Sequence, residues 1–489
     1  MKHKKKVLIV GGGTAGTVIL DVIHEHFDVV VFDQSKNREM PFLYRVPIAI
    51  GLLFSRKSSY VKKLNVKASN GRLIPFFQSN CLGGASVING SVHVIGSLDT
   101  WHRTFDKYQL AFKNFFSLYE SLYTKKLNSG RIRLKEQTPD ELDEAFYKSM
   151  QSFGVEPGTS EFFEKPMCGP IWNTVKLFSR SSVLDLGPER LKAVKLDSTV
   201  DDIEIENDVV RGVRVGNQIV KADIVILAGG VAGTGSLLCR LMDKLKSGKN
   251  ENKIHGVKDH TNIRINVKSK KRVFTLNQLK LKFPKKIFFF LKYWKSLVSI
   301  IRGSGASSAA NIDLYGDGKV SLRINLLRFH ESGRLGSSGE LFDNSDCGFS
   351  LSLTQVNPIS RGFVDQQGTI HPGYLSSPED MNFLTDALKY ATNLLQTPPL
   401  SEYVDEIVNL DEILINPEKY IRENFHSGYH LIGGSADLID SEFRVAGIQG
   451  LYCCDSSALS EYPSSNIHSS VVILAKAFAQ RLVQTAYKE

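Results

Sequence analysis

Two histidines near the C-terminus have the chemistry of a proton-transfer site. His430 and His468 lie 38 residues apart, with Asp455 between them. A neutral imidazole has an unperturbed pKa of about 6.5, so it can accept a proton near neutral pH. A second imidazole can hydrogen-bond to the same hydroxyl group and orient it. Such a pair suits the oxidation of an alcohol, in which a base removes the hydroxyl proton while an electron acceptor takes a hydride from carbon.

That chemistry needs an electron acceptor, and the start of the chain predicts where one would bind. A strand over Lys5–Val10 leads into Gly11, Gly13 and Gly16, which fit G-x-G-x-x-G, and a helical pattern and a second strand ending at Asp33 follow. The glycines allow a tight turn, a close approach of the backbone to a pyrophosphate, and packing of the helix on the strand. Asp33 is placed to accept a hydrogen bond from a ribose 2′-hydroxyl, which favours FAD or NAD over NADP. An ordinary glycine-rich turn is the alternative.

A second glycine-rich stretch, "NCLGGASVINGSVHVIGSLDTW", covers Asn80–Trp101. Gly83 and Gly84, followed by Ser86 and Asn89, predict a loop that brings backbone N–H groups and a side-chain amide against a flat ligand. A β-turn followed by a strand is the structural alternative.

Together these stretches resemble the glucose–methanol–choline (GMC) family of flavoprotein oxidoreductases, in which a GGSSxxNG-type loop lies beside the flavin ring. Some members attach the flavin through a histidine just before the asparagine. This chain has Ile88 there, so the resemblance implies non-covalent FAD. The segment Ala222–Leu238 is similar to the second family signature, although Cys239–Lys244 and Thr261 depart from the family pattern. The cofactor-binding residues that these motifs imply are Gly11, Gly13, Gly16, Asp33, Gly83, Gly84, Ser86, Asn89, Val200, Gly229 and Asp455.

The last seventy residues resemble the C-terminal block of the same family. The resemblance places His430 on the catalytic histidine, Asp455 on an acid that binds the ribityl or pyrophosphate region of the flavin, and His468 on the second active-site position. That position is His or Asn in different relatives, and Asn466 is the alternative, but the following helix "VVILAKAF" favours His468. Surface or core roles are expected for the remaining histidines near motifs, which are His93, His260 and His426.

The order of the motifs predicts an α/β fold with two domains. A discontinuous, Rossmann-like FAD-binding domain would comprise residues 1–104, 166–265 and 424–489. A substrate domain with α+β character would comprise residues 105–165 and 266–423, built on an antiparallel sheet with helices on one face. The active site would lie between the two domains.

Composition narrows the partners and the compartment. The formal charge of +10 comes with lysine clusters that lack a nucleic-acid-binding signature, so a solvated basic surface is predicted rather than a nucleic-acid partner. Six cysteines show neither disulfide-framework nor metal-site spacing, which favours a reducing, cytoplasmic location. We expect neither a signal peptide nor a transmembrane helix. The aromatic segment Ile287–Ile301 is expected to pack on the protein itself, with peripheral membrane contact or a substrate entrance as the alternatives.

The working hypothesis is an FAD-dependent oxidoreductase that oxidises a CH–OH group of a sugar, polyol or other alcohol. His430 would take the hydroxyl proton, hydride would pass to flavin N5, and the electrons would continue to oxygen, a quinone or a redox partner. The alternatives are a flavin-containing lyase of the same fold, a nicotinamide enzyme if only the first motif is trusted, and a non-catalytic FAD-binding relative.

Overall fold

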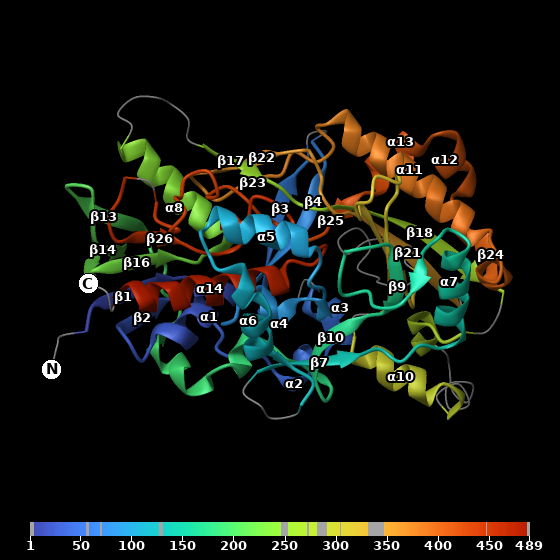
Figure 1. The fold of residues 1–489 in the computed structure, drawn as a ribbon, viewed down its shortest axis with the longest axis horizontal. Helices are drawn as coiled ribbons and strands as arrows, with labels where there is room; N and C mark the ends of the chain where they lie inside the picture. Colours follow the sequence, from blue (N-terminus) through green and yellow to red (C-terminus); the bar gives the residue numbers. More distant parts are fainter. Residues whose placement is uncertain are drawn as a thin grey trace.

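A computed structural model describes residues 4–54, 58–68, 71–126, 131–245, 253–270, 273–280, 291–303, 305–330, 347–445 and 447–486. Two large sheets dominate the described residues, one parallel and one mainly antiparallel. In Figure 1 the parallel sheet and its helices occupy the left half of the molecule, and the antiparallel sheet lies on the right.

The first sheet has five parallel strands in the order β12-β2-β1-β16-β26. The central strands β1 and β16 are almost entirely buried apolar residues, as expected for a sheet that is covered on both faces. Helix α1 follows β1 and packs against the C-terminal helix α14, which runs beside it in Figure 1. The elements are β1 (Lys6–Val10), α1 (Thr14–Ile23), β2 (Asp28–Phe32), β12 (Val194–Lys195), β16 (Ile224–Leu227), α8 (Gly230–Leu245), β26 (Leu451–Cys453) and α14 (His468–Ala486).

The second sheet has eight strands, with the path β24-β18-β21-β20-β19-β9-β8 and β25 paired to β18. Its strands are antiparallel, apart from the parallel pair β8 and β9. Helices α7 and α11 contact its strands. The elements are α7 (Glu141–Gln151), β8 (Glu156–Pro157), β9 (Met167–Pro170), β18 (Thr261–Ser269), β19 (Ala306–Ile312), β20 (Leu322–Leu327), β21 (Gly348–Gln355), α11 (Pro378–Leu395), β24 (Val404–Ile407) and β25 (His426–Ser427).

The described residues also form four further sheets, of two to five strands. They are β3 (Val61–Lys67) with β4 (Leu73–Ser79); β13 (Asp202–Glu206), β14 (Val209–Val215) and β15 (Gln218–Lys221); β17 (Lys253–Val257), β22 (Gly362–Asp365) and β23 (Ile370–His371); and β11 (Ser179–Arg180), β10 (Trp172–Lys176), β7 (Ile132–Glu136) and β6 (Tyr123–Thr124), with β5 (Val92–His93) on β10.

The remaining helices are short and connect the sheets. The α-helices are α2 (Phe42–Arg45), α3 (Ile50–Leu53), α4 (Ala85–Ile88), α5 (Leu98–Lys107), α6 (Phe115–Leu122), α10 (Trp294–Ile301), α12 (Leu410–Ile415) and α13 (Pro417–Asn424). The 3₁₀ helices are η1 (Pro47–Ala49), η2 (Phe112–Asn114), η3 (Val183–Asp185), η4 (Pro188–Ala193), η5 (Leu276–Lys280), η6 (Leu400–Tyr403) and η7 (Ser456–Ala458).

The predicted fold class is confirmed, and the predicted domain division stays a prediction. All five parallel strands fall within the three ranges expected for the nucleotide domain. Strands β9 and β25 and the first residues of β18 also fall within those ranges, yet they pair in the antiparallel sheet. The chain therefore crosses between the two sheets near residues 166–170, 261–265 and 426–427.

The aromatic segment that begins at Ile287 is described from residue 291 onward, and its first residues lie outside the described part. Leu297 and Ile300 of α10 are buried in a small apolar cluster, whereas Leu291 and Trp294 are 74% and 62% exposed. Among the described residues, no helix combines the length and the apolar character needed to cross a membrane.

Candidate active site

The loop after β25 carries His430, and a buried carboxylate fixes its shape. Asp259, two residues before the start of β18, accepts a hydrogen bond from the backbone N–H of His430 (2.8 Å). The same carboxylate accepts hydrogen bonds from the hydroxyls of Ser427 and Tyr374. Burial raises the pKa of Asp259 to about 6, and these hydrogen bonds act in the opposite direction. The loop that carries His430 is therefore tied to the first residues of the antiparallel sheet.

The imidazole of His430 has a partner at each nitrogen. Its Nδ1 lies 3.0 Å from Nδ1 of His260, and its Nε2 lies 3.2 Å from the side-chain amide nitrogen of Asn466. On the far side of His260, Nε2 lies 2.8 Å from the carbonyl oxygen of Val356. Four groups from distant parts of the chain thus form one continuous line of polar contacts.

The carbonyl of Val356 determines where the protons lie along this line. Because a carbonyl only accepts hydrogen bonds, a neutral His260 must carry its proton on Nε2 and present a lone pair at Nδ1. Nδ1 of His430 must then donate, which leaves Nε2 of His430 without a proton. The amide N–H of Asn466 can donate to that lone pair. The contacts therefore select the tautomer of His430 that has a basic Nε2.

Desolvation keeps both imidazoles in the neutral form that this argument requires. Although His430 keeps some exposed surface, its position deep in the protein lowers its pKa well below the usual value, and the nearby His260 lowers it further. Burial likewise lowers the pKa of His260 to about 4. The ring of Tyr462 covers His260, with ring centroids 3.8 Å apart, and its hydroxyl donates to the carbonyl of His430 (3.0 Å).

His468, the other histidine predicted to be catalytic, begins α14 and lies beside a different group of residues. Desolvation, with a smaller contribution from His93, lowers the pKa of His468 to about 3. Its Nε2 is buried and has no hydrogen-bond partner among the described residues. His93 contacts the hydroxyl of Tyr119 (3.1 Å) and the carboxylate of Glu161 (3.2 Å). The side chain in direct contact with Nε2 of His430 is Asn466, so the role of His468 stays a prediction.

His260 is the site residue that sequence reasoning missed. A surface or core role was expected for it, whereas in the structure its ring contacts His430 across 170 residues of chain. The local signal was the pair Asp259-His260 directly before the strand β18. An acid next to a histidine in the sequence does not distinguish an active-site pair from a buried structural pair. The distinction depends on which other residues the fold brings into contact with them.

The G-x-G-x-x-G loop after β1 is shaped to approach a ligand closely. Gly11 has a φ of +111°, and a Cβ there would lie 2.5 Å from the carbonyl oxygen of Ala228. A Cβ on Gly16 would lie 1.9 Å from the carbonyl oxygen of Gly11, so helix and turn pack too closely for any side chain. Beside Gly13, by contrast, the nearest atoms would be 4.0 Å away, and α1 begins there without a side-chain cap. Open space at an uncapped helix N-terminus suits a phosphate.

The second glycine loop packs directly on the first. A Cβ on Gly84 would lie 2.8 Å from the Cα of Gly13, and the backbone N–H of Ser86 donates to the hydroxyl of Thr14 (3.2 Å). The predicted flavin loop and the predicted pyrophosphate loop therefore lie in direct contact, as one dinucleotide would require.

Two predicted cofactor acids occupy the edges of this region. Asp33, at the end of β2, accepts hydrogen bonds from the backbone N–H groups of Gly12 (2.6 Å) and Ser35 (2.8 Å). Each of its oxygens has a further lone pair for a ribose hydroxyl. Asp455 accepts from the N–H of Gly230 (2.8 Å) and thereby caps the start of α8. The cofactor contacts of both acids stay predictions, as do those of Gly83, Asn89, Val200 and Gly229.

These residues fit an FAD. The glycines leave room where the backbone must approach a pyrophosphate, and Asp33 supplies an acceptor for a ribose. At the covalent-attachment position, Ile88 is buried and has no nucleophile. Burial raises the pKa of the neighbouring Cys81 thiol to about 12, which makes it unreactive. Within the described residues, His, Cys, Asp and Glu side chains form no cluster able to hold a metal ion.

Known protein sequences are similar to this chain over part or all of its length. Residues 358–475, which include His430, Asp455 and His468, match the family model described as GMC oxidoreductase. The chain is 28% identical over 176 residues to the glucose dehydrogenase (FAD, quinone) of Drosophila melanogaster, a match that covers 30% of this chain and 28% of that relative. It is 20% identical over 538 aligned positions to the oxygen-dependent choline dehydrogenase of Yersinia pestis, covering 97% of this chain and 93% of the relative.

Solved structures share the fold over the whole chain. Pyridoxine 4-oxidase from Mesorbium loti superposes with a TM-score of 0.78 at 18% identity, covering 98% of this chain and 99% of the other. Formate oxidase superposes with a TM-score of 0.81 at 17% identity, covering 100% of both chains. At these identities the likeness establishes the fold, and the roles of individual residues must be argued from their contacts.

Proposed function

Because the chain belongs to the GMC oxidoreductases, we propose that it is an FAD-dependent enzyme that oxidises a CH–OH group of a small alcohol. The observation that carries the proposal is the line of contacts from Val356 through His260 to His430, which leaves Nε2 of His430 unprotonated and able to accept a proton. Bound FAD would supply the two-electron acceptor for a hydride. The relatives are named for different substrates, glucose and choline, and for different acceptors, a quinone and oxygen, so the alcohol and the final acceptor are left unspecified.

Residues of the chain have separate roles in the proposed reaction. Nε2 of His430 accepts the hydroxyl proton of the substrate, and the amide of Asn466 releases that nitrogen and donates to the substrate oxygen. His260 accepts from Nδ1–H of His430 throughout and so holds the ring in its productive tautomer. Asp259 fixes the backbone of His430, and once that ring is protonated the nearby carboxylate offsets part of its charge.

The cofactor would be held by the backbone of the two glycine loops and by the acid that follows β2. The first turn of α1 beside Gly13 would receive the pyrophosphate, and Asp33 would receive a ribose hydroxyl. Ile88 supports non-covalent attachment of the FAD. One structural neighbour, a formate oxidase from Aspergillus oryzae, is the subject of work on FAD modification, so the state of the flavin must be measured for this chain. Acid precipitation of the protein should therefore release intact FAD into the supernatant.

Anaerobic spectroscopy of the purified holoenzyme tests the proposal. We expect visible flavin bands that bleach when one class in a panel of sugars, polyols and other alcohols is added. His430→Gln should slow bleaching about 10²- to 10⁴-fold, the usual loss for a general base. The matched control, His102→Gln, changes an exposed histidine on α5 and should bleach like the unchanged protein.

Two results would contradict the proposal. Flavin bands that no alcohol in the panel bleaches would favour the lyase or the non-catalytic reading. A His430→Gln protein that retains the full bleaching rate would remove His430 from the mechanism.

A further inference from the structure

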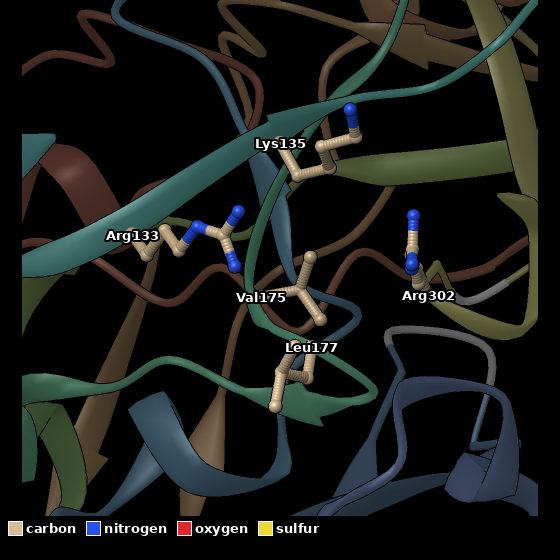
Figure 2. A pocket seen from close by; sticks show the side chains of 5 residues that line it. All are labelled: Arg133, Lys135, Val175, Leu177 and Arg302. Carbon is tan, nitrogen blue, oxygen red and sulfur yellow. The ribbon is translucent and has the colours of Figure 1, made fainter. Parts of the chain in front are cut away.

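A cavity of about 260 Å³ opens between β7, β10 and the end of α10, and it shares no lining residue with the candidate active site. Figure 2 shows the five side chains that line it, three of them cationic. The lining residues are Arg133, Lys135, Val175, Leu177 and Arg302.

The three cations of the cavity lack counter-charges. Within the described residues no ion pair is found for any of them, and no acid lines the cavity; Lys135 is exposed, whereas Arg133 and Arg302 are half-buried. The Nε atoms of Arg133 and Arg302 are buried without a hydrogen-bond partner. Like charges around one space repel, and buried donors without acceptors cost free energy. An anion in the cavity would relieve both costs.

A phosphate group matches this donor set better than a single carboxylate. Arg133 and Lys135 of β7 and Arg302 at the end of α10 bring two guanidinium groups and an ammonium to the lining of the cavity, and a phosphate offers three acceptor oxygens and up to two negative charges. The planar donors of arginine suit phosphate oxygens in particular. We propose that this cavity binds the phosphate group of an anionic ligand.

The source of the phosphate could be a soluble phosphomonoester or the headgroup of an acidic phospholipid. Leu177, which lines the cavity, is 57% exposed, and the ring of the next residue, Phe178, lies 5.0 Å from the guanidinium carbon of Arg302. Trp294 is also exposed on α10, the helix that ends next to Arg302. Exposed apolar side chains beside a cationic site are compatible with a lipid surface as well as with a soluble ligand.

The test compares charge-matched variants of the holoenzyme. Arg133→Gln/Arg302→Gln removes two cations of the cavity, and Lys113→Gln/Lys319→Gln removes two exposed cations elsewhere. One arm measures the thermal midpoint in inorganic phosphate and in glycerol 3-phosphate against chloride at equal ionic strength. The other arm measures cosedimentation with phosphatidylcholine vesicles that contain or lack phosphatidic acid.

We expect the unchanged protein and the lysine variant to bind in at least one arm. The arginine variant should bind at least about tenfold more weakly, because each charge-assisted hydrogen bond lost is worth that much. Binding in the soluble arm assigns a free phosphate compound, and binding in the vesicle arm alone assigns a lipid headgroup. The proposal is overturned if the unchanged protein binds in neither arm, or if the lysine variant loses as much as the arginine variant, since charge alone would then explain the binding.

Discussion

At the scale of single residues, the proposed site depends on which ring nitrogen of His430 carries the proton. The tautomer of His430 is set by His260, and that of His260 is set by a backbone carbonyl. An imidazole without such neighbours would divide between two tautomers, one of which carries its proton on the nitrogen that must act as base. His260 is therefore a positioning residue in the proposed mechanism.

Substitution of His260 tests this role. His260→Phe keeps a ring of similar size and removes the acceptor at Nδ1, so we expect kcat to fall about 10- to 100-fold, the loss typical of partners that orient metal-binding histidines, with little change in KM. His260→Gln offers an amide oxygen to His430 and an amide N–H to Val356, so it should recover most of the rate. Steady-state kinetics on a bleaching substrate provide the measurement. Equal losses in both variants would indicate a packing role instead.

Residues whose role is local could be predicted from the sequence. Gly11, Gly13 and Gly16 act within one turn, where spacing alone reports the geometry. His430 was found through its motif. The contact between His260 and His430 could not be predicted, because it forms only when β18 and the loop after β25 become neighbours in the antiparallel sheet.

At the scale of elements, a buried ion pair ties α7 to the antiparallel sheet. Arg328, just after β20, pairs with Asp143 within α7 and with Asp140 at its N-cap. Arg328 and Asp143 are almost fully buried, and Ser307 in β19 donates to the same carboxylate as Arg328.

The strands of this sheet could not be placed from the sequence, because they pair with segments that lie far away along the chain. Strand β9 joins the sheet through pairing with β19, a partner about 140 residues later in the chain.

Loss of one member of this pair should be far more damaging than loss of both. Arg328→Met leaves Asp143 charged and buried, so we expect the free energy of unfolding to fall by about 3–5 kcal/mol. Arg328→Met/Asp143→Asn removes both charges and keeps an acceptor for the serine, so it should recover at least half of that loss. Urea unfolding followed by tryptophan fluorescence gives both values. If the double variant were less stable than the single one, the pair would not be coupled in this way.

At the scale of the whole molecule, the folded state holds several imidazoles neutral against their normal titration. Burial depresses the pKa of His260, His430 and His468, so each contributes stability that is present above about pH 6.5 and is lost as the pH falls toward the folded pKa. Asp259 acts in the opposite direction. Its pKa is raised to about 6, so its contribution is present below about pH 3.8 and is lost as the pH rises through 6. The acid side of the stability profile is thus a balance of opposed groups.

His468→Gln isolates one member of that balance. Because the folded pKa of His468 is about 3, the unfolded chain binds one more proton at this residue than the folded chain over the window from about pH 6 to pH 4. Each such proton makes stability fall by about 1.4 kcal/mol per pH unit of acidification. The variant cannot bind that proton in either state, so its stability should decline less steeply by this amount, whatever its stability at pH 7. Urea midpoints of the variant and of the unchanged protein, measured across the window, provide the slopes. A His468→Gln slope that runs parallel to that of the unchanged protein would mean that His468 binds its proton equally in the folded and unfolded states, which would contradict this prediction.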